Sequence, residues 1–123
     1  MHEVSVASLE ATLEVSGTGT FDPVGGSATI GGTVTCSSAV VVGVEGILRQ
    51  VRSGLYLARG YTWLQAPCEP GDPMAWSVEV DSETSYAFGA GASRLTYWAY
   101  ASDGWQWVLL ADREMADITL QSS

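Results

Sequence analysis

The feature that most constrains the fold of this chain is a pair of aromatic and apolar runs, within residues 95–110, that flank a single Asp103-Gly104 step. This pattern predicts a β-hairpin with a two-residue type I′ turn, because Asp and Gly tolerate the positive φ angles that such a turn requires. A two-residue turn also fixes the register of the two strands. The expected cross-strand pairs are Ser102 with Trp105, Ala101 with Gln106, Tyr100 with Trp107, Ala99 with Val108, Trp98 with Leu109, and Tyr97 with Leu110.

Side chains alternate across a strand, so this register sorts the hairpin into two faces. The first face is mostly aliphatic and carries Leu95, Tyr97, Ala99, Ala101, Val108 and Leu110. The second face is strongly aromatic and carries Trp98, Tyr100, Trp105, Trp107 and Leu109. One face must contribute to the core, and the other is then either covered by the rest of the chain or exposed as an aromatic surface.

The rest of the chain also indicates strands. Fourteen glycines, many Val, Thr and Ser residues and no sustained helical period favour an all-β fold. Besides the hairpin, we expect strands over residues 9–16 (or on to 21), 28–36, 40–52, 55–66, 76–81 and 118–120. Both faces of the 55–66 run are apolar, so its core side stays unassigned. The remaining segments are expected as turns, loops or irregular structure, notably residues 22–26, 67–73, 82–91 and 112–117.

About seven short strands separated by turn signals are typical of an all-β, immunoglobulin-like, two-sheet antiparallel β-sandwich. The 123 residues are enough for one domain with its own core, so we expect a single domain over residues 1–123. Within it, residues 1–8 are expected to be a flexible or strand-donating N-terminal segment. Gly43 and Gly46 interrupt the run over residues 40–52 and indicate bulges or a close backbone approach.

The two cysteines, Cys36 and Cys68, each end a strand-like run. An even number of cysteines in a small β-rich chain predicts one disulfide, and the alternative is two buried free thiols. The opening Met1-His2-Glu3 lacks the basic and apolar regions of a signal peptide, so the chain is either cytoplasmic or the mature form of an exported protein. The expected disulfide favours export, to the cell surface or the extracellular space.

Charge and residue usage argue against several classes of function. Fourteen acidic residues against five arginines, with no lysine, give a net charge of −9 and no basic patch for nucleic acid. No apolar run approaches the ~20 residues of a membrane span. His2, the only histidine, lies at the N-terminus, where chain ends are commonly frayed, so a catalytic triad would have no positioned base. Glu79 and Asp81 are expected to be solvated acids. We therefore predict a non-enzymatic protein with no catalytic residues and no cofactor.

Acidic loops give a weak signal for a metal site. A Ca²⁺ ion takes about six to eight oxygen ligands, which here would have to come from converging loops. The candidates are Glu69 and Asp72 in one loop and Asp112, Glu114 and Asp117 in another. No spaced loop motif accompanies them, so we predict solvated acids and no metal.

Several residues form a recurrent pattern when they are taken in order: Gly32-Thr33-Val34-Thr35-Cys36, Gln50, Cys68, Trp76-Ser77-Val78-Glu79-Val80 and Phe88-Gly89-Ala90-Gly91-Ala92. The pattern resembles that of small, uncharacterised secreted domains common in actinobacteria and other GC-rich bacteria. The resemblance covers roughly residues 16–120. It implies an immunoglobulin-like sandwich, export and a Cys36–Cys68 disulfide, and it carries no catalytic residues. The hairpin departs from the pattern, because its aromatic residues stand where small or β-branched ones are expected.

The aromatic face of the hairpin therefore carries the functional hypothesis, with three interpretations. It could be core, covered by the chain's own loops or by its N-terminal segment. It could bind a protein or another copy of the chain, because aromatic residues dominate interface hot spots. It could also stack sugars, as in carbohydrate-binding modules, on Trp98, Tyr100 and Trp107, with hydrogen bonds from the nearby Arg94, Thr96 and Gln106.

We hypothesise a non-enzymatic extracellular binding or surface-assembly module, with a carbohydrate-binding module as the alternative. Exposed sheet edges at Val4-Ser5-Val6 and at the C-terminal strand would let copies of the chain add strands to one another, so a homo-oligomer or filament is one form of this hypothesis. No nucleic acid and no membrane insertion are expected.

Overall fold

The computed structural model describes residues 10–54 and 56–123, and this part of the chain consists of β-strands and connecting loops. The strands are β1 (Ala11–Val15), β2 (Thr18–Phe21), β3 (Ala28–Cys36), β4 (Val40–Ser53), β5 (Tyr56–Cys68), β6 (Met74–Val80), β7 (Gly91–Ser102) and β8 (Trp107–Ser122). The all-β prediction is therefore confirmed. The expected strand-donating segment lies outside the described residues. The C-terminal strand, expected as an exposed sheet edge, is instead paired on both sides, with β2 and with β7.

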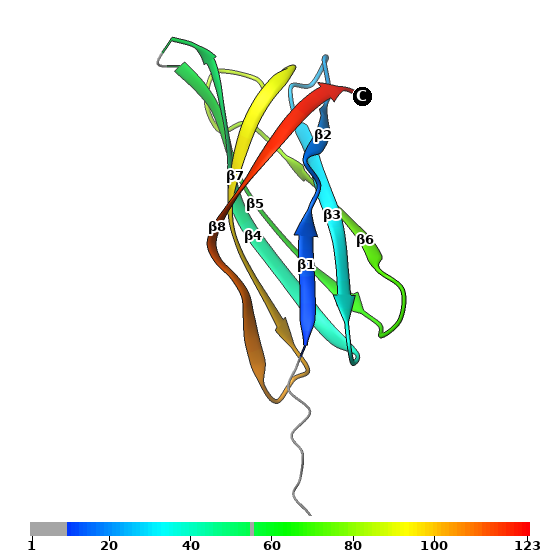
Figure 1. Ribbon diagram of the computed structural model, residues 1–123. Coiled ribbons are helices and arrows are strands. Elements are labelled where there is room, and N and C mark those ends of the chain that lie inside the picture. Colours follow the sequence, from blue (N-terminus) through cyan, green and yellow to red (C-terminus); the bar gives the residue numbers. More distant parts are fainter. Residues whose placement is uncertain (1–9, 55) are drawn as a thin grey trace, which may run out of the picture.

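The strands form one mixed sheet with the order β1-β3-β2-β8-β7-β4-β5, in which β6 pairs with the other edge of β3. All of these pairs are antiparallel except β2 with β8. Figure 1 shows the sheet as two halves, with β1, β3 and β6 on one side and β8, β7, β4 and β5 on the other. The strand β2 connects the halves, because it bonds to β3 and to β8.

The expected first strand is divided in two, so the described chain has eight strands instead of about seven. The first part, β1, pairs with the end of β3 near Cys36. After the Ser16-Gly17 step the chain runs on as β2, which pairs with the start of β3 and lies parallel to β8. Two contacts hold the step in place, because the Ser16 amide donates to the Gly31 carbonyl and the Thr119 amide donates to the Gly17 carbonyl. Because of this division, one stretch of sequence pairs with strands in both halves of the sheet.

The core lies between the two halves and forms two clusters of buried side chains. The cluster near the disulfide consists of Val34, Cys36, Val40, Val42, Val44, Cys68, Trp76, Ala99, Ala101 and Ala111. The second consists of Ala28, Ile30, Leu48, Ala58, Val80, Phe88, Leu95, Ile118 and Leu120. Each cluster takes residues from both halves, so burial of the inward-facing positions holds the halves together.

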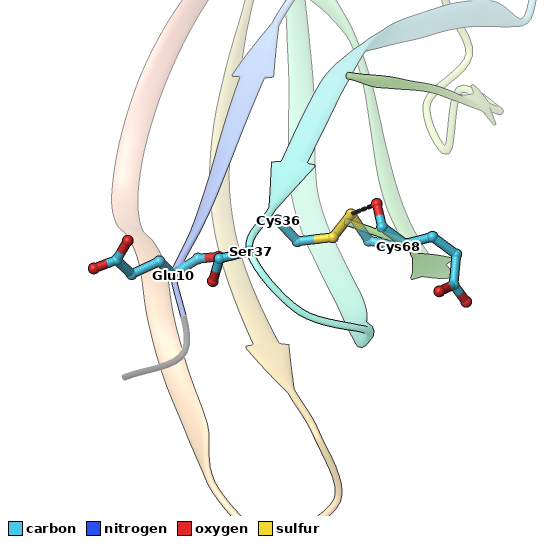
Figure 2. Close-up of a disulfide and its surroundings, with 5 residues drawn as sticks. Glu10, Cys36, Ser37 and Cys68 are labelled. Carbon is cyan, nitrogen blue, oxygen red and sulfur yellow. Dashed lines mark hydrogen bonds between the residues drawn. A yellow bond between two sulfur atoms is a disulfide. The ribbon is translucent and has the colours of Figure 1, made fainter. Parts of the chain in front are cut away.

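The disulfide joins the two halves at one end of the core. Cys36 ends β3 and Cys68 ends β5; the two Cα atoms are 6.4 Å apart and the sulfur atoms are bonded. Figure 2 shows the bond and the neighbouring Ser37, whose amide and hydroxyl both donate to the Glu10 carbonyl. The predicted pairing is confirmed, and closing a loop of this length stabilises the fold by about 4 kcal/mol in the chain-entropy model.

The hairpin is confirmed, but its predicted turn and register are wrong. Four residues, Asp103 to Gln106, connect the strands, and Ser102 pairs with Trp107. The Asp103 carboxylate accepts the Trp105 and Gln106 amides at 2.8 and 3.0 Å, and Gly104 alone in this loop has a positive φ. The Asp side chain therefore stabilises a wider loop than the type I′ turn.

The new register keeps most side chains on their predicted face, because it differs by two residues and side chains alternate with a period of two. Tyr100 now pairs with Leu109, not with Trp107. Leu95, Tyr97, Ala99, Ala101, Val108 and Leu110 all pack in or against the core. Trp105 is the exception among the predicted aromatic residues, because it lies in the loop.

Two segments expected as loops belong to strands. Pro67 lies in β5 and pairs with Val41, and this position tolerates proline because β5 is the last strand in the sheet order, where an amide on the free edge needs no partner. The expected irregular segment before Ile118 is part of β8, although the register shifts there and Arg113 has a φ of 55°. The strand is therefore continuous but bulged.

Candidate functional site

The predicted aromatic residues lie on the outer surface of β8, β7, β4 and β5, which we call the front face. Its outward side chains form cross-strand rows, because the register of the four strands places them opposite one another. From the hairpin loop toward the other end, the rows are Pro67, Val41, Ser102 and Trp107; Gln65, Gly43, Tyr100 and Leu109; Trp63, Glu45 and Trp98; Tyr61, Ile47, Thr96 and Met115; and Arg59, Arg49, Arg94 and Asp117. Successive rows are about 7 Å apart along the strands.

Aromatic side chains on this face are exposed to solvent. Trp107 is 68% exposed and Trp63 is 60% exposed, while Trp98 and Tyr100 are half-buried. Trp105 is 96% exposed in the adjoining loop. The loops among the described residues therefore leave the face open, in contrast to the interpretation in which the chain's own loops cover it; the N-terminal segment, the other expected cover, lies outside the described residues.

Tyr100 lies at the centre of the front face. Its ring covers Gly43 on the neighbouring strand, where a Cβ atom would collide with the ring. The Gln65 amide donates to the Tyr100 hydroxyl at 2.6 Å. The close neighbour of Gly43 is a side-chain ring instead of the expected bulge or backbone approach, and the missing side chain allows the ring to lie against the sheet.

Glu45 brings a carboxylate among the aromatic side chains. It lies between Trp63 and Trp98 in its row. The Tyr61 hydroxyl donates to Glu45 Oε2 at 2.8 Å, and this hydrogen bond raises the pKa of Tyr61. The second carboxylate oxygen gives the face a hydrogen-bond acceptor for a ligand.

Open hollows lie on either side of Tyr100. One has a volume of about 450 Å³ and is lined chiefly by Glu45, Trp98, Trp107 and Leu109. A second, of about 160 Å³, is lined by Glu45, Tyr61, Trp63, Leu64, Gly43 and Val44. Tyr100 borders both, so its ring forms a ridge between two apolar depressions that share one carboxylate.

The front face ends in three arginines that lie directly opposite one another on adjacent strands, which we call the arginine row: Arg59, Arg49 and Arg94. Arg94 Nε is 2.9 Å from Asp117 Oδ1 in an exposed ion pair. Among the described residues, Arg49 and Arg59 have no such partner. Like charges placed directly opposite one another destabilise a sheet, so this row is costly for the isolated chain.

Four front-face residues were not predicted from the sequence, because the aromatic face was inferred from the hairpin alone and they lie on β4 and β5: Glu45, Tyr61, Trp63 and Gln65. The sequence did contain an indication of their position. Arg59 and Gln65 lie at alternate positions with Tyr61 and Trp63, so all four side chains point to the same side of the strand, and the two polar ones indicate that this side faces solvent. The hydrogen-bonding residues expected for sugar binding are spread out, since Thr96 and Arg94 lie one and two rows beyond Trp98 and Gln106 lies in the hairpin loop.

The acidic residues considered for metal binding are not grouped together in the described part of the chain. Within residues 10–54 and 56–123, no three His, Cys, Asp or Glu side chains are grouped so that they could hold a metal ion. Glu79 and Asp81 are exposed at the end of β6. The same residues contain no helix that could cross a membrane.

Comparison with models of known protein families and with curated protein sequences found no match to this chain.

Proposed function

We propose that this protein is a non-enzymatic binding module that docks a protein partner against its front face, in adhesion or in assembly of a surface structure. The observation that carries the proposal is the exposed aromatic surface across four adjacent strands, centred on Trp98 and Tyr100. Exposed apolar patches of this kind on soluble proteins mark interaction sites. Trp, Tyr and Arg are also the residues most enriched in interface hot spots, and all three occur on the front face.

We further propose an extracellular or cell-surface location and an immunoglobulin-like sandwich. The disulfide supports the location, because such bonds persist in oxidising compartments. The two halves of the sheet, packed around one core and joined by Cys36–Cys68, support the sandwich. The parallel pairing of β2 with β8 departs from the fully antiparallel sandwich expected from the sequence.

The proposal is tested by truncating the aromatic side chains. Self-association would be measured by size-exclusion chromatography with light scattering, and retention of cell-envelope proteins by the immobilised protein. We expect Trp98→Ala and Trp107→Ala each to weaken binding by about thirtyfold or more, since truncated hot-spot aromatics cost ~2 kcal/mol or more. The control is Val24→Ala, which truncates a fully exposed apolar side chain away from the front face, in the loop between β2 and β3. Unchanged binding by both tryptophan variants would contradict the proposal.

A carbohydrate ligand is the second candidate, and one specific observation favours it. The Tyr100 ring lies against the sheet over Gly43 and is flanked by Gln65 and Glu45, so an aromatic surface and polar side chains lie together. Sugar rings bind through the same combination of apolar stacking and hydroxyl hydrogen bonds. In affinity electrophoresis through soluble polysaccharides, a sugar-binding protein would be retarded and Tyr100→Ala would migrate freely. Equal migration in gels with and without polysaccharide would exclude this candidate.

A further inference from the structure

We infer that the partner of the front face is a second copy of this chain, which presents the outer surface of its β1, β3 and β6. This inference rests on the proposed function and adds the identity of the partner. It follows from the opposite charges of the two outer surfaces of the same molecule.

The front face concentrates the positive charge of a strongly acidic chain. Three of the five arginines form the arginine row, although the whole chain has a net charge of −9. The acidic residues in the front-face rows are Glu45 and Asp117, and these already interact with Tyr61 and Arg94. Arg49 and Arg59 are therefore left to interact with carboxylates from outside the described residues of their own chain.

The opposite surface, which we call the back face, is polar and negative. Its outward residues on β1, β3 and β6 are Thr12, Glu14, Thr29, Thr33, Thr35, Ala75, Ser77 and Glu79. These three strands contain no arginine, and Glu10 and Asp81 adjoin them as further exposed acids. The outward side chains of this face are mostly small, so an aromatic ring of a partner could approach the sheet closely.

The positions of the charges set the geometry of such a contact. Arg59 and Arg94 flank β4 in one cross-strand row and lie about 10 Å apart, which is two strand spacings. Glu14 and Glu79 flank β3 with an offset of four residues along the strand, so they lie about 16 Å apart, and the long arginine side chains would have to reach outward to meet both carboxylates. Contact between two front faces would instead bring two arginine rows into one interface.

A front-to-back contact uses a different surface on each copy, so it continues from copy to copy. Such heterologous contacts generate rings or open filaments. The same contact would relieve the repulsion in the arginine row: Asp117 of the same chain pairs with Arg94, and a neighbouring copy would supply carboxylates to Arg49 and Arg59.

A charge-exchange experiment tests the inference. The front variant carries Arg49→Glu and Arg59→Glu, and the back variant carries Glu14→Arg and Glu79→Arg. All four positions are exposed, so circular dichroism and thermal melting should show an intact fold. Sedimentation velocity over a wide concentration range would then measure association of the wild type, of each variant, and of the two variants mixed in equal amounts.

We expect the wild type to associate, more weakly at high salt, and each variant alone to associate at least about tenfold more weakly, because like charges then meet at every contact. The equimolar mixture should regain association, since each front then meets a back of opposite charge. If the charge reversals unfold the protein, the neutral pair Arg49→Gln with Arg59→Gln and the pair Glu14→Gln with Glu79→Gln should still weaken association.

Three outcomes would overturn the inference in distinguishable ways. A back variant that associates like the wild type, beside a monomeric front variant, would indicate contact between two front faces. A monomeric wild type that still retains an envelope protein through Trp98 would leave the proposed function standing with a foreign partner. A monomeric wild type that is retarded by a polysaccharide, with Tyr100→Ala unaffected by it, would indicate a glycan.

Discussion

At the scale of single residues, Gln50 shows how one buried polar side chain holds a loop. It is 2% exposed, its amide donates to the Gly89 carbonyl at 2.7 Å, and its carbonyl oxygen accepts the Gly89 amide at 2.9 Å. This two-way bridge ties the segment before β7 to β4. Gln50 stood out in the sequence only as part of a resemblance, and the structure supplies its physical role.

We expect Gln50→Leu to lower the free energy of unfolding by about 2–4 kcal/mol, because it leaves two buried backbone groups of Gly89 without partners. Urea denaturation followed by tryptophan fluorescence would measure the loss. The matched control is Gln65→Leu, an exposed position on β5, where we expect a change of less than ~1 kcal/mol. Equal stability of the two variants would show that the bridge contributes nothing net.

Replacement of glycine by alanine should affect stability differently at Gly43 and at Gly32, where other groups come close to the backbone. At Gly43 the added Cβ meets the outer end of the Tyr100 ring, which can rotate away from the sheet. At Gly32 it meets the backbone carbonyl of Glu14, which cannot move without disturbing β1.

We therefore expect Gly43→Ala to change stability by less than ~1 kcal/mol and Gly32→Ala to cost about 1–3 kcal/mol or more. Chemical denaturation measures both. Gly43→Ala should also break the hydrogen bond between Gln65 and Tyr100, visible in the NMR shifts of the Gln65 side-chain amide. A Gly43 variant as destabilised as the Gly32 variant would mean that the Tyr100 ring is fixed in place.

At the scale of elements, the hairpin loop depends on the charge of Asp103. Its carboxylate accepts the amides of Gln106 and Trp105, and these hydrogen bonds lower the pKa of Asp103. A carboxyl group whose pKa is lowered on folding contributes stability above its unfolded pKa and loses it as the pH falls through the folded pKa.

We expect NMR titration to show Asp103 ionising below the usual range of about 3.9 for aspartate, with the Trp105 and Gln106 amide shifts following the same curve. Asp103→Asn keeps an oxygen acceptor and removes the titration, so those amide shifts should become insensitive to acid. If Asp103 titrates as an ordinary aspartate, or if the amides follow a different group, the carboxylate does not organise the loop.

At the scale of the whole molecule, the disulfide is the covalent link between the two halves of the sheet. Cys36 and Cys68 are both buried and lie 32 residues apart in the chain. The bond restricts the unfolded chain more than the folded one, which is the main source of its stabilisation in the chain-entropy model.

We expect reduction to lower the free energy of unfolding by about 4 kcal/mol and the melting temperature by roughly 10–20 °C. Thermal melts with and without a phosphine reductant would measure this. The double variant Cys36→Ala with Cys68→Ala should melt near the reduced protein and should not respond to the reductant. If reduction leaves the wild-type melting temperature unchanged, packing alone holds the halves together.

The sequence by itself determined the all-β class, which alternate side chains of most strands face the core, and which two cysteines pair. These are local properties, because alternation with a period of two is written in consecutive residues. The predicted hairpin register was wrong, but most side chains still lie on their predicted face, because the true register differs by two residues.

Only the tertiary structure decided which strands are neighbours. The pairing of β4 with β7 and β5 brings Gln65 to the Tyr100 hydroxyl across 35 residues of sequence, and it places Trp63 and Glu45 beside Trp98. It also aligns the three arginines of the arginine row. The physical reason is that strand neighbours are set by burial of both halves against one core, which no single stretch of sequence encodes.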